Sequence, residues 1–81
     1  MKTEQNIENK IFDIIKKIIN NNSINKDSLF LDEGWLDSLS TIELLTEIEK
    51  SFNITIENDQ LTHENFNSLN KITELVVKKC R

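Results

Sequence analysis

The sequence has no proline and a single glycine, Gly34, so it lacks the residues that most often interrupt helices. With 37% hydrophobic and 30% charged residues, it has the composition of a folded helical domain and not of a disordered segment. A β-sandwich, which needs many short strands joined by turns, is disfavoured. The chain has 81 residues, and we expect one domain over residues 1–81.

Cysteine is equally scarce, because Cys80 is the only one. A single thiol excludes an internal disulfide and a cysteine-based metal site, and we expect it to be exposed and incidental. No hydrophobic run approaches the roughly 20 residues that span a membrane. The first residues also lack the basic-then-apolar pattern of a secretory signal. We therefore expect a cytoplasmic protein that does not insert into a membrane.

Basic residues are nearly missing from the middle of the chain. Residues 27–64 contain ten acids and only Lys50 as a base, a local net charge of −9, whereas the whole chain has −4. An acidic segment repels nucleic acid and anionic lipid and attracts a basic protein surface. A solvated face that maintains solubility is an equally good interpretation of the charge alone.

Hydrophobic residues at helical spacing predict three main helices. The first runs from about Glu4 to Ile19, and the polar cluster at residues 20–23 ends it. The second covers Ser38 to Phe52, is capped by Asp37 or Ser38, and ends near Asn53. The last starts at Asn67 or Ser68 as cap and contains Leu69, Ile72, Leu75 and Val76. An extended stretch, residues 54–57, and a short turn or half-helix, residues 61–66, precede it.

About fifteen residues separate the first two helices. So long a loop in a small domain is usually functional. We expect five hydrophobic residues to fix it to the core: Leu29, Phe30, Leu31, Trp35 and Leu36.

The second helix carries two hydrophobic faces. At about 100° per residue, the core stripe contains Leu44, Leu45, Ile48 and Phe52. Leu39 and Ile42 lie on the flank beside Glu43 and Glu47, which predicts a small exposed apolar patch rimmed by acids. The core stripe is expected to face Ile11, Ile14, Ile15 and Ile18. These side chains are bulky and leave little room for a ligand between the two helices.

Ser38 is the candidate functional residue, but not as a catalytic nucleophile. The glycines of a nucleophile elbow are absent, and His63, the only histidine, lies in a polar segment where a surface role is the expectation. The acids around residues 27–37 lack the ligand spacing of a calcium loop, and no phosphate-binding glycine loop is present. A serine at a helix N-terminus is well placed to bear a covalently attached phosphate, although it can also serve only as a cap.

The stretch from Asp32 to Leu45, centred on Asp37-Ser38-Leu39, resembles the attachment motif of acyl and peptidyl carrier proteins. The order of helices extends the resemblance over nearly the whole chain. Gly34, three residues before Asp37, and the Phe66-Asn67-Ser68 entry to the last helix are most similar to D-alanyl carrier proteins and stand-alone aminoacyl carriers. Leu39 and Leu69 differ from the Met and Pro that are common in those proteins.

The resemblance implies an all-α, antiparallel four-helix bundle with a long loop after the first helix and a short third helix. It also implies that a phosphopantetheinyl transferase attaches 4′-phosphopantetheine from coenzyme A to Ser38. The terminal thiol then carries acyl or aminoacyl groups as thioesters. Partner recognition is expected from Trp35, Leu36, Asp37, Leu39, Ile42, Glu43 and Glu47.

In this interpretation an adenylation- or ligase-type enzyme loads the carrier, and a downstream enzyme accepts the acyl or aminoacyl group. The carrier itself is expected to be a monomer without catalytic activity. A small aminoacyl cargo is the favoured interpretation, with a fatty-acyl or polyketide carrier as the alternative. An unmodified acidic interaction module, in which Ser38 only caps a helix, is the alternative from another class.

Overall fold

A computed structural model describes residues 4–21 and 23–80. Its helices are, in chain order, α1 (Glu4–Ile19), α2 (Ser38–Phe52), the 3-10 helix η1 (Asn58–Gln60), α3 (His63–Phe66) and α4 (Leu69–Cys80). The described ranges contain no strand, only an isolated antiparallel bridge between Leu29 and Ser68. The predicted all-helical class is confirmed.

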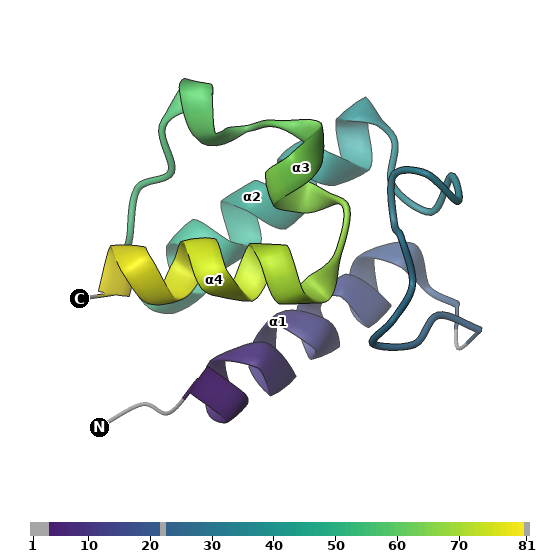
Figure 1. Cartoon of the computed structure of the whole chain (residues 1–81), viewed down its shortest axis with the longest axis horizontal. Coiled ribbons are helices and arrows are strands. Elements are labelled where there is room, and N and C mark those ends of the chain that lie inside the picture. The colour runs from purple at the N-terminus through teal and green to yellow at the C-terminus, as the bar shows by residue number, and fades with distance from the viewer. Residues whose placement is uncertain (1–3, 22, 81) are drawn as a thin grey trace.

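Helix α1 packs against both α2 and α4. In Figure 1 the chain crosses the molecule along α1 and returns in the opposite direction along α2 and along α4. The short helix α3 packs on α4, and the loop between α1 and α2 closes one end of the bundle. Among the described helices, none is both long and apolar enough to cross a membrane.

Helices α1 and α2 each end on an asparagine in the left-handed conformation. Asn20 and Asn53 each have φ of 55°, and their N–H groups reach back to the last helical turns. Glycine usually fills this position because it has no Cβ, and asparagine is the next best choice. A chain with one glycine thus terminates its helices with a residue that it has in abundance.

The core lies where α1, α2 and α4 meet. Its fully buried side chains include Ile11 and Ile15 of α1, Leu44 and Ile48 of α2, and Ile72 and Val76 of α4. The predicted core positions Ile14, Ile18 and Leu45 are only half-buried and pack against its edge. The helical faces are therefore as predicted, with a narrower buried stripe.

The predicted half-helix at residues 61–66 begins two residues later than expected, at His63. Thr62 is its cap, because its hydroxyl accepts a hydrogen bond from the N–H of Asn65 at 3.2 Å. Ser68, one of the two predicted caps of α4, accepts from the N–H of Lys71 at 3.2 Å. This leaves the side chain of Asn67 free for other contacts.

The loop is fixed to the core by four of its five predicted hydrophobic residues. Phe30 and Leu36 are buried, and Leu31 and Trp35 are half-buried against the core. The prediction for Leu29 is wrong, because its side chain is 41% exposed. The segment is locally extended, so successive side chains alternate in direction. Buried Ser28 and Phe30 therefore flank an outward-facing Leu29.

Candidate cofactor-attachment site

Asp37 defines the start of α2. Its backbone is extended, and its side-chain Oδ1 accepts a hydrogen bond from the N–H of Ser40 at 2.8 Å. Its carbonyl oxygen accepts from the hydroxyl of Thr41 at 2.7 Å. The hydrogen bond from the Ser40 backbone stabilises the ionised carboxylate and lowers the pKa of Asp37. Asp37, one of the two predicted caps, is thus the N-cap, and Ser38 is the first residue of the helix.

Ser38 is exposed at this first helical position. Within residues 4–21 and 23–80, no side chain forms a hydrogen bond with its hydroxyl. Because Asp37 takes over the capping function, the Ser38 hydroxyl is not needed to satisfy the helix terminus. The geometry leaves this oxygen available for chemistry.

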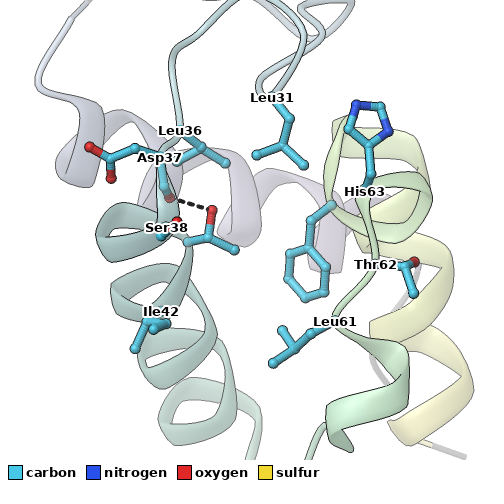
Figure 2. A pocket seen from close by; sticks show the side chains of 10 residues that line it. Leu31, Leu36, Asp37, Ser38, Ile42, Leu61, Thr62 and His63 are labelled. Atoms are coloured by element: carbon cyan, nitrogen blue, oxygen red, sulfur yellow. Dashed lines mark hydrogen bonds between the residues drawn. The ribbon is translucent and has the colours of Figure 1, made fainter.

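A pocket of about 420 Å³ opens beside Ser38. Figure 2 shows side chains from the start of α2 on one side and from the segment around α3 on the other. The ten lining residues are Leu31, Leu36, Asp37, Ser38, Thr41, Ile42, Leu61, Thr62, His63 and Phe66. The lining is polar at Ser38, Thr62 and His63 and hydrophobic at Leu31, Leu61 and Phe66.

The pocket lies outside the core that the sequence predicts to be filled. The core between α1 and α2 is filled as expected, since Ile11, Ile15, Leu44 and Ile48 have no exposed surface. The hollow lies instead between α2 and the α3 segment. A filled core therefore does not exclude an apolar cargo, because a separate volume lies next to Ser38.

A hydrogen-bonded cluster includes His63, one of the residues that line this pocket. The side-chain Oδ1 of Asn67 accepts from the N–H groups of Leu31 and Asp32, both at 3.0 Å. Its Nδ2 donates to Asp32 Oδ2 at 3.0 Å, and Asp32 Oδ1 lies 2.6 Å from His63 Nε2. The hydrogen bonds from Asn67 and then His63 lower the pKa of Asp32. The cluster links the loop before Ser38 to the segment around α3.

The residues expected to recognise partners fall into two groups. Leu39 and Ile42 are 68% and 56% exposed, and the acids Glu43 and Glu47 beside them are exposed too. The predicted apolar patch with an acidic rim is therefore present on α2. Asp37 is also exposed.

Trp35 and Leu36 lie at the end of the loop. Trp35 is half-buried, and its Nε1 donates to Glu33 Oε1 at 3.0 Å. Leu36 is only 4% exposed. Its side chain packs in the core and also lines the pocket. Contacts of Trp35 and Leu36 with partners stay predictions.

Three residues of the site are not identified from the sequence. The sequence pattern indicates a helix cap at Asn67 and an isolated surface residue at His63. It gives Asp32 only as the first residue of the stretch that resembles the attachment motif. Asn67 and Asp32 are 35 residues apart, so no local pattern reveals their contact. The position of Asn67 directly after the buried Phe66 is the one available signal.

Comparison with known proteins identifies the family of this chain. The family model described as "Phosphopantetheine attachment site" matches residues 9–76. The acyl carrier protein of Chlorobium phaeobacteroides is 34% identical over 95% of this chain and 99% of its own length. The D-alanyl carrier proteins of Streptococcus uberis and Lactococcus lactis are 38% and 36% identical, over 84% and 90% of this chain and 87% and 95% of theirs. The chain therefore belongs to the phosphopantetheine-dependent carrier protein family.

Proposed function

We propose that this carrier protein bears its 4′-phosphopantetheine on Ser38. The observation that carries the proposal is the exposed, unbonded hydroxyl of Ser38 at the start of α2, within the segment matched by the family model. Ser40, the next serine, is less exposed, and its N–H is held by Asp37. Ser38 is therefore the better substrate for a transferase.

The residues around Ser38 fit a phosphopantetheine group. A phosphodiester on the serine oxygen would lie at the positive end of the α2 dipole, near the N–H groups of the first turn. The pocket of about 420 Å³ adjoins the attachment point and offers polar and apolar surface to a flexible arm. When bound, the group supplies a terminal thiol that forms thioesters.

The carrier is proposed to contribute position and not catalysis. Attachment forms a bond from Ser38 Oγ to the phosphorus that carries the pantetheine. It breaks the bond from that phosphorus to the bridging oxygen of the pyrophosphate of coenzyme A, so adenosine 3′,5′-bisphosphate leaves, and the hydroxyl proton must be removed. His63, the only imidazole of the chain, is engaged with Asp32. The transferase therefore has to supply the base.

The acid-rimmed patch on α2 suits short-lived binding to several enzymes. Glu43 and Glu47 attract basic partner surfaces from a distance, and Leu39 and Ile42 supply a small desolvated contact. The proposed partners are a phosphopantetheinyl transferase, an adenylation-type loading enzyme and an enzyme that accepts the cargo. The proposed form is a monomer in the cytoplasm.

The proposed cargo is a small aminoacyl group of the D-alanyl type. Support comes from the relatives named D-alanyl carrier protein and from a core that is filled between α1 and α2. A fatty-acyl cargo is the second candidate. It is favoured by the relative named acyl carrier protein and by the partly apolar pocket beside Ser38.

Intact mass spectrometry tests the attachment site. The purified chain is incubated with a phosphopantetheinyl transferase and coenzyme A, and it should gain the mass of one phosphopantetheine. Ser38→Ala should gain none, whereas the matched control Ser40→Ala should be modified like the parent. An unmodified parent protein would favour the interaction module, and a modified Ser38→Ala would refute the assignment to Ser38.

A further inference from the structure

We infer that Asn67 is a positioning residue for Ser38: its side chain locks the loop before α2 in the conformation that partner enzymes recognise. This inference rests on the proposed function of Ser38. It assigns a role in modification and loading to a residue that lies at the junction of α3 and α4, outside the attachment motif.

The first argument is the number of loop atoms that Asn67 holds. Its backbone carbonyl oxygen accepts a hydrogen bond from the N–H of Phe30 at 2.7 Å. Its side chain forms three further hydrogen bonds with Leu31 and Asp32. The orientation of the amide is determined, because two N–H groups face its oxygen and a carboxylate faces its nitrogen. Three consecutive loop residues are thus fixed by one residue.

The second argument is the short path from these residues to Ser38. The N–H of Leu36 donates to the carbonyl oxygen of Phe30 at 3.0 Å, so the two ends of the small loop 30–36 are joined. Phe30 and Leu36 are both buried. The residue after Leu36 is Asp37, the N-cap of α2. A displacement of residues 30–32 is therefore transmitted to the helix start on which Ser38 lies.

The third argument is that, besides the hydrophobic packing of its ends and the backbone hydrogen bonds within it, the turn has few contacts that fix it to the rest of the described molecule. Asp32 and Glu33 are exposed, and Gly34 has φ of 79° with open space within 4 Å of the place that a Cβ would occupy. Inside the turn, Glu33 accepts from the N–H of Leu29 at 3.3 Å and from Trp35 Nε1 at 3.0 Å. Among the residues that the structure describes, Asn67 and His63 make the side-chain polar contacts between the turn and the rest of the molecule.

Paired substitutions separate this role from general stability. Asn67→Ala removes the three side-chain hydrogen bonds. Asn67→Asp keeps the acceptor oxygen but places a second carboxylate against Asp32. The exchange variant Asp32→Asn/Asn67→Asp restores a donor–acceptor pair with the parent's net charge. Ile7→Val trims a buried side chain in the first turn of α1, and it is the matched control for a lowered melting temperature. This helix begins at the end of the bundle away from the loop between α1 and α2 (Figure 1).

The first readout is kcat/KM for modification by the transferase, corrected for the folded fraction measured by circular dichroism. Asn67→Ala and Asn67→Asp should each lower it by about tenfold, the exchange variant should recover most of the loss, and Ile7→Val should leave it unchanged. If Asn67→Ala does not fold, Asn67→Asp and the exchange variant carry the test.

The second readout is amide hydrogen exchange. The N–H of Leu36 is not bonded to Asn67, so protection lost there in Asn67→Asp would show that the effect travels toward Ser38. Amides in the middle of α1 should keep their protection. Unchanged kcat/KM in the folded Asn67 variants, or an equal loss in Ile7→Val, would overturn the inference. If the parent is not modified at all, the proposed function fails instead.

Discussion

The carboxylate of Asp32 lies 2.6 Å from Nε2 of His63, a residue 31 positions further along the chain. Both side chains are more than half exposed, at 51% and 61%. A solvent-exposed pair of this kind contributes little to stability by itself. Its significance lies in its place, since it joins the loop before Ser38 to the first residue of α3, which also lines the pocket.

The acids at this site predict how stability depends on pH. Hydrogen bonds lower the pKa of Asp32 and of Asp37 below the ordinary value of 3.8. The contribution of each ionised carboxylate to the free energy of unfolding is therefore complete when the pH is above the ordinary pKa. It is lost as the pH falls through the lowered pKa of the folded state. We expect the free energy of unfolding in urea to be lower at about pH 3 than at about pH 6.

The variants Asp32→Asn and Asp37→Asn should reduce this acid dependence. Asp59→Asn, which removes the same charge from an exposed position of η1, is the control. An equal effect of all three changes would mean that net charge, and not these hydrogen bonds, causes the dependence.

Charge reversal on α2 should slow modification through the association rate. The double variant Glu43→Lys/Glu47→Lys should associate with the transferase about tenfold more slowly at low salt, and the difference should shrink as salt rises. Glu4→Lys/Asp13→Lys changes the net charge equally on α1 and should have a smaller effect. Stopped-flow kinetics at two ionic strengths measures both. Equal rates for the two variants would remove α2 from the interface.

Leu39 tests the apolar part of the same patch. Leu39→Ala should weaken binding with little dependence on salt, because the lost interaction is burial of apolar surface on the partner. The side chain is 68% exposed in the free protein, so its removal should leave the melting temperature nearly unchanged. A strongly salt-dependent loss of affinity would contradict this assignment.

Thr73 offers a prediction about the core. Its hydroxyl is buried in α4 and, among the described residues, has no hydrogen-bond partner. Thr73→Val removes an unsatisfied polar group and keeps the branched shape, so it should raise the free energy of unfolding by about 1 kcal/mol. Thr46→Val is the control, because the exposed Thr46 hydroxyl donates to the carbonyl oxygen of Ile42 at 3.0 Å. A stabilisation of similar size in the control would exclude the buried hydroxyl as the cause.

The cargo can be distinguished by NMR of the loaded protein. Compared with the unloaded protein that carries phosphopantetheine, an alanyl group should leave the chemical shifts of the pocket residues Leu61 and Phe66 unchanged, because a small polar group remains in solvent. An octanoyl group that enters the pocket would shift both and would favour the fatty-acyl candidate. Ile11 and Leu44, in the filled core, should stay unchanged in either case.

The sequence predicts those features that depend on neighbouring residues. The start of α2 follows from Asp37 and the hydrophobic spacing after it, and the exposure of Leu39 and Ile42 follows from their helical angle. The end of α1 follows from its asparagines. Each of these signals lies within one or two helical turns.

The remaining features depend on tertiary structure. The pocket exists because the α3 segment lies opposite the start of α2. The periodicity of the sequence does not indicate how far apart these two segments lie. The outward direction of Leu29 depends on its pairing with Ser68 in an otherwise irregular loop. Asparagine is a common helix cap, so the sequence suggests that role for Asn67. Only the folded structure shows that its side chain binds Leu31 and Asp32 instead.

The hydrogen bond between the side chains of Asp32 and Asn67 also affects the order of events during protein synthesis. The two residues are 35 positions apart, so a nascent chain that has emerged only as far as α2 presents Ser38 before Asn67 has emerged and can hold the loop. Asn67, which follows α3, must emerge before Ser38 acquires its final setting. A transferase that requires that setting would act only after Asn67 has emerged and packed against the loop.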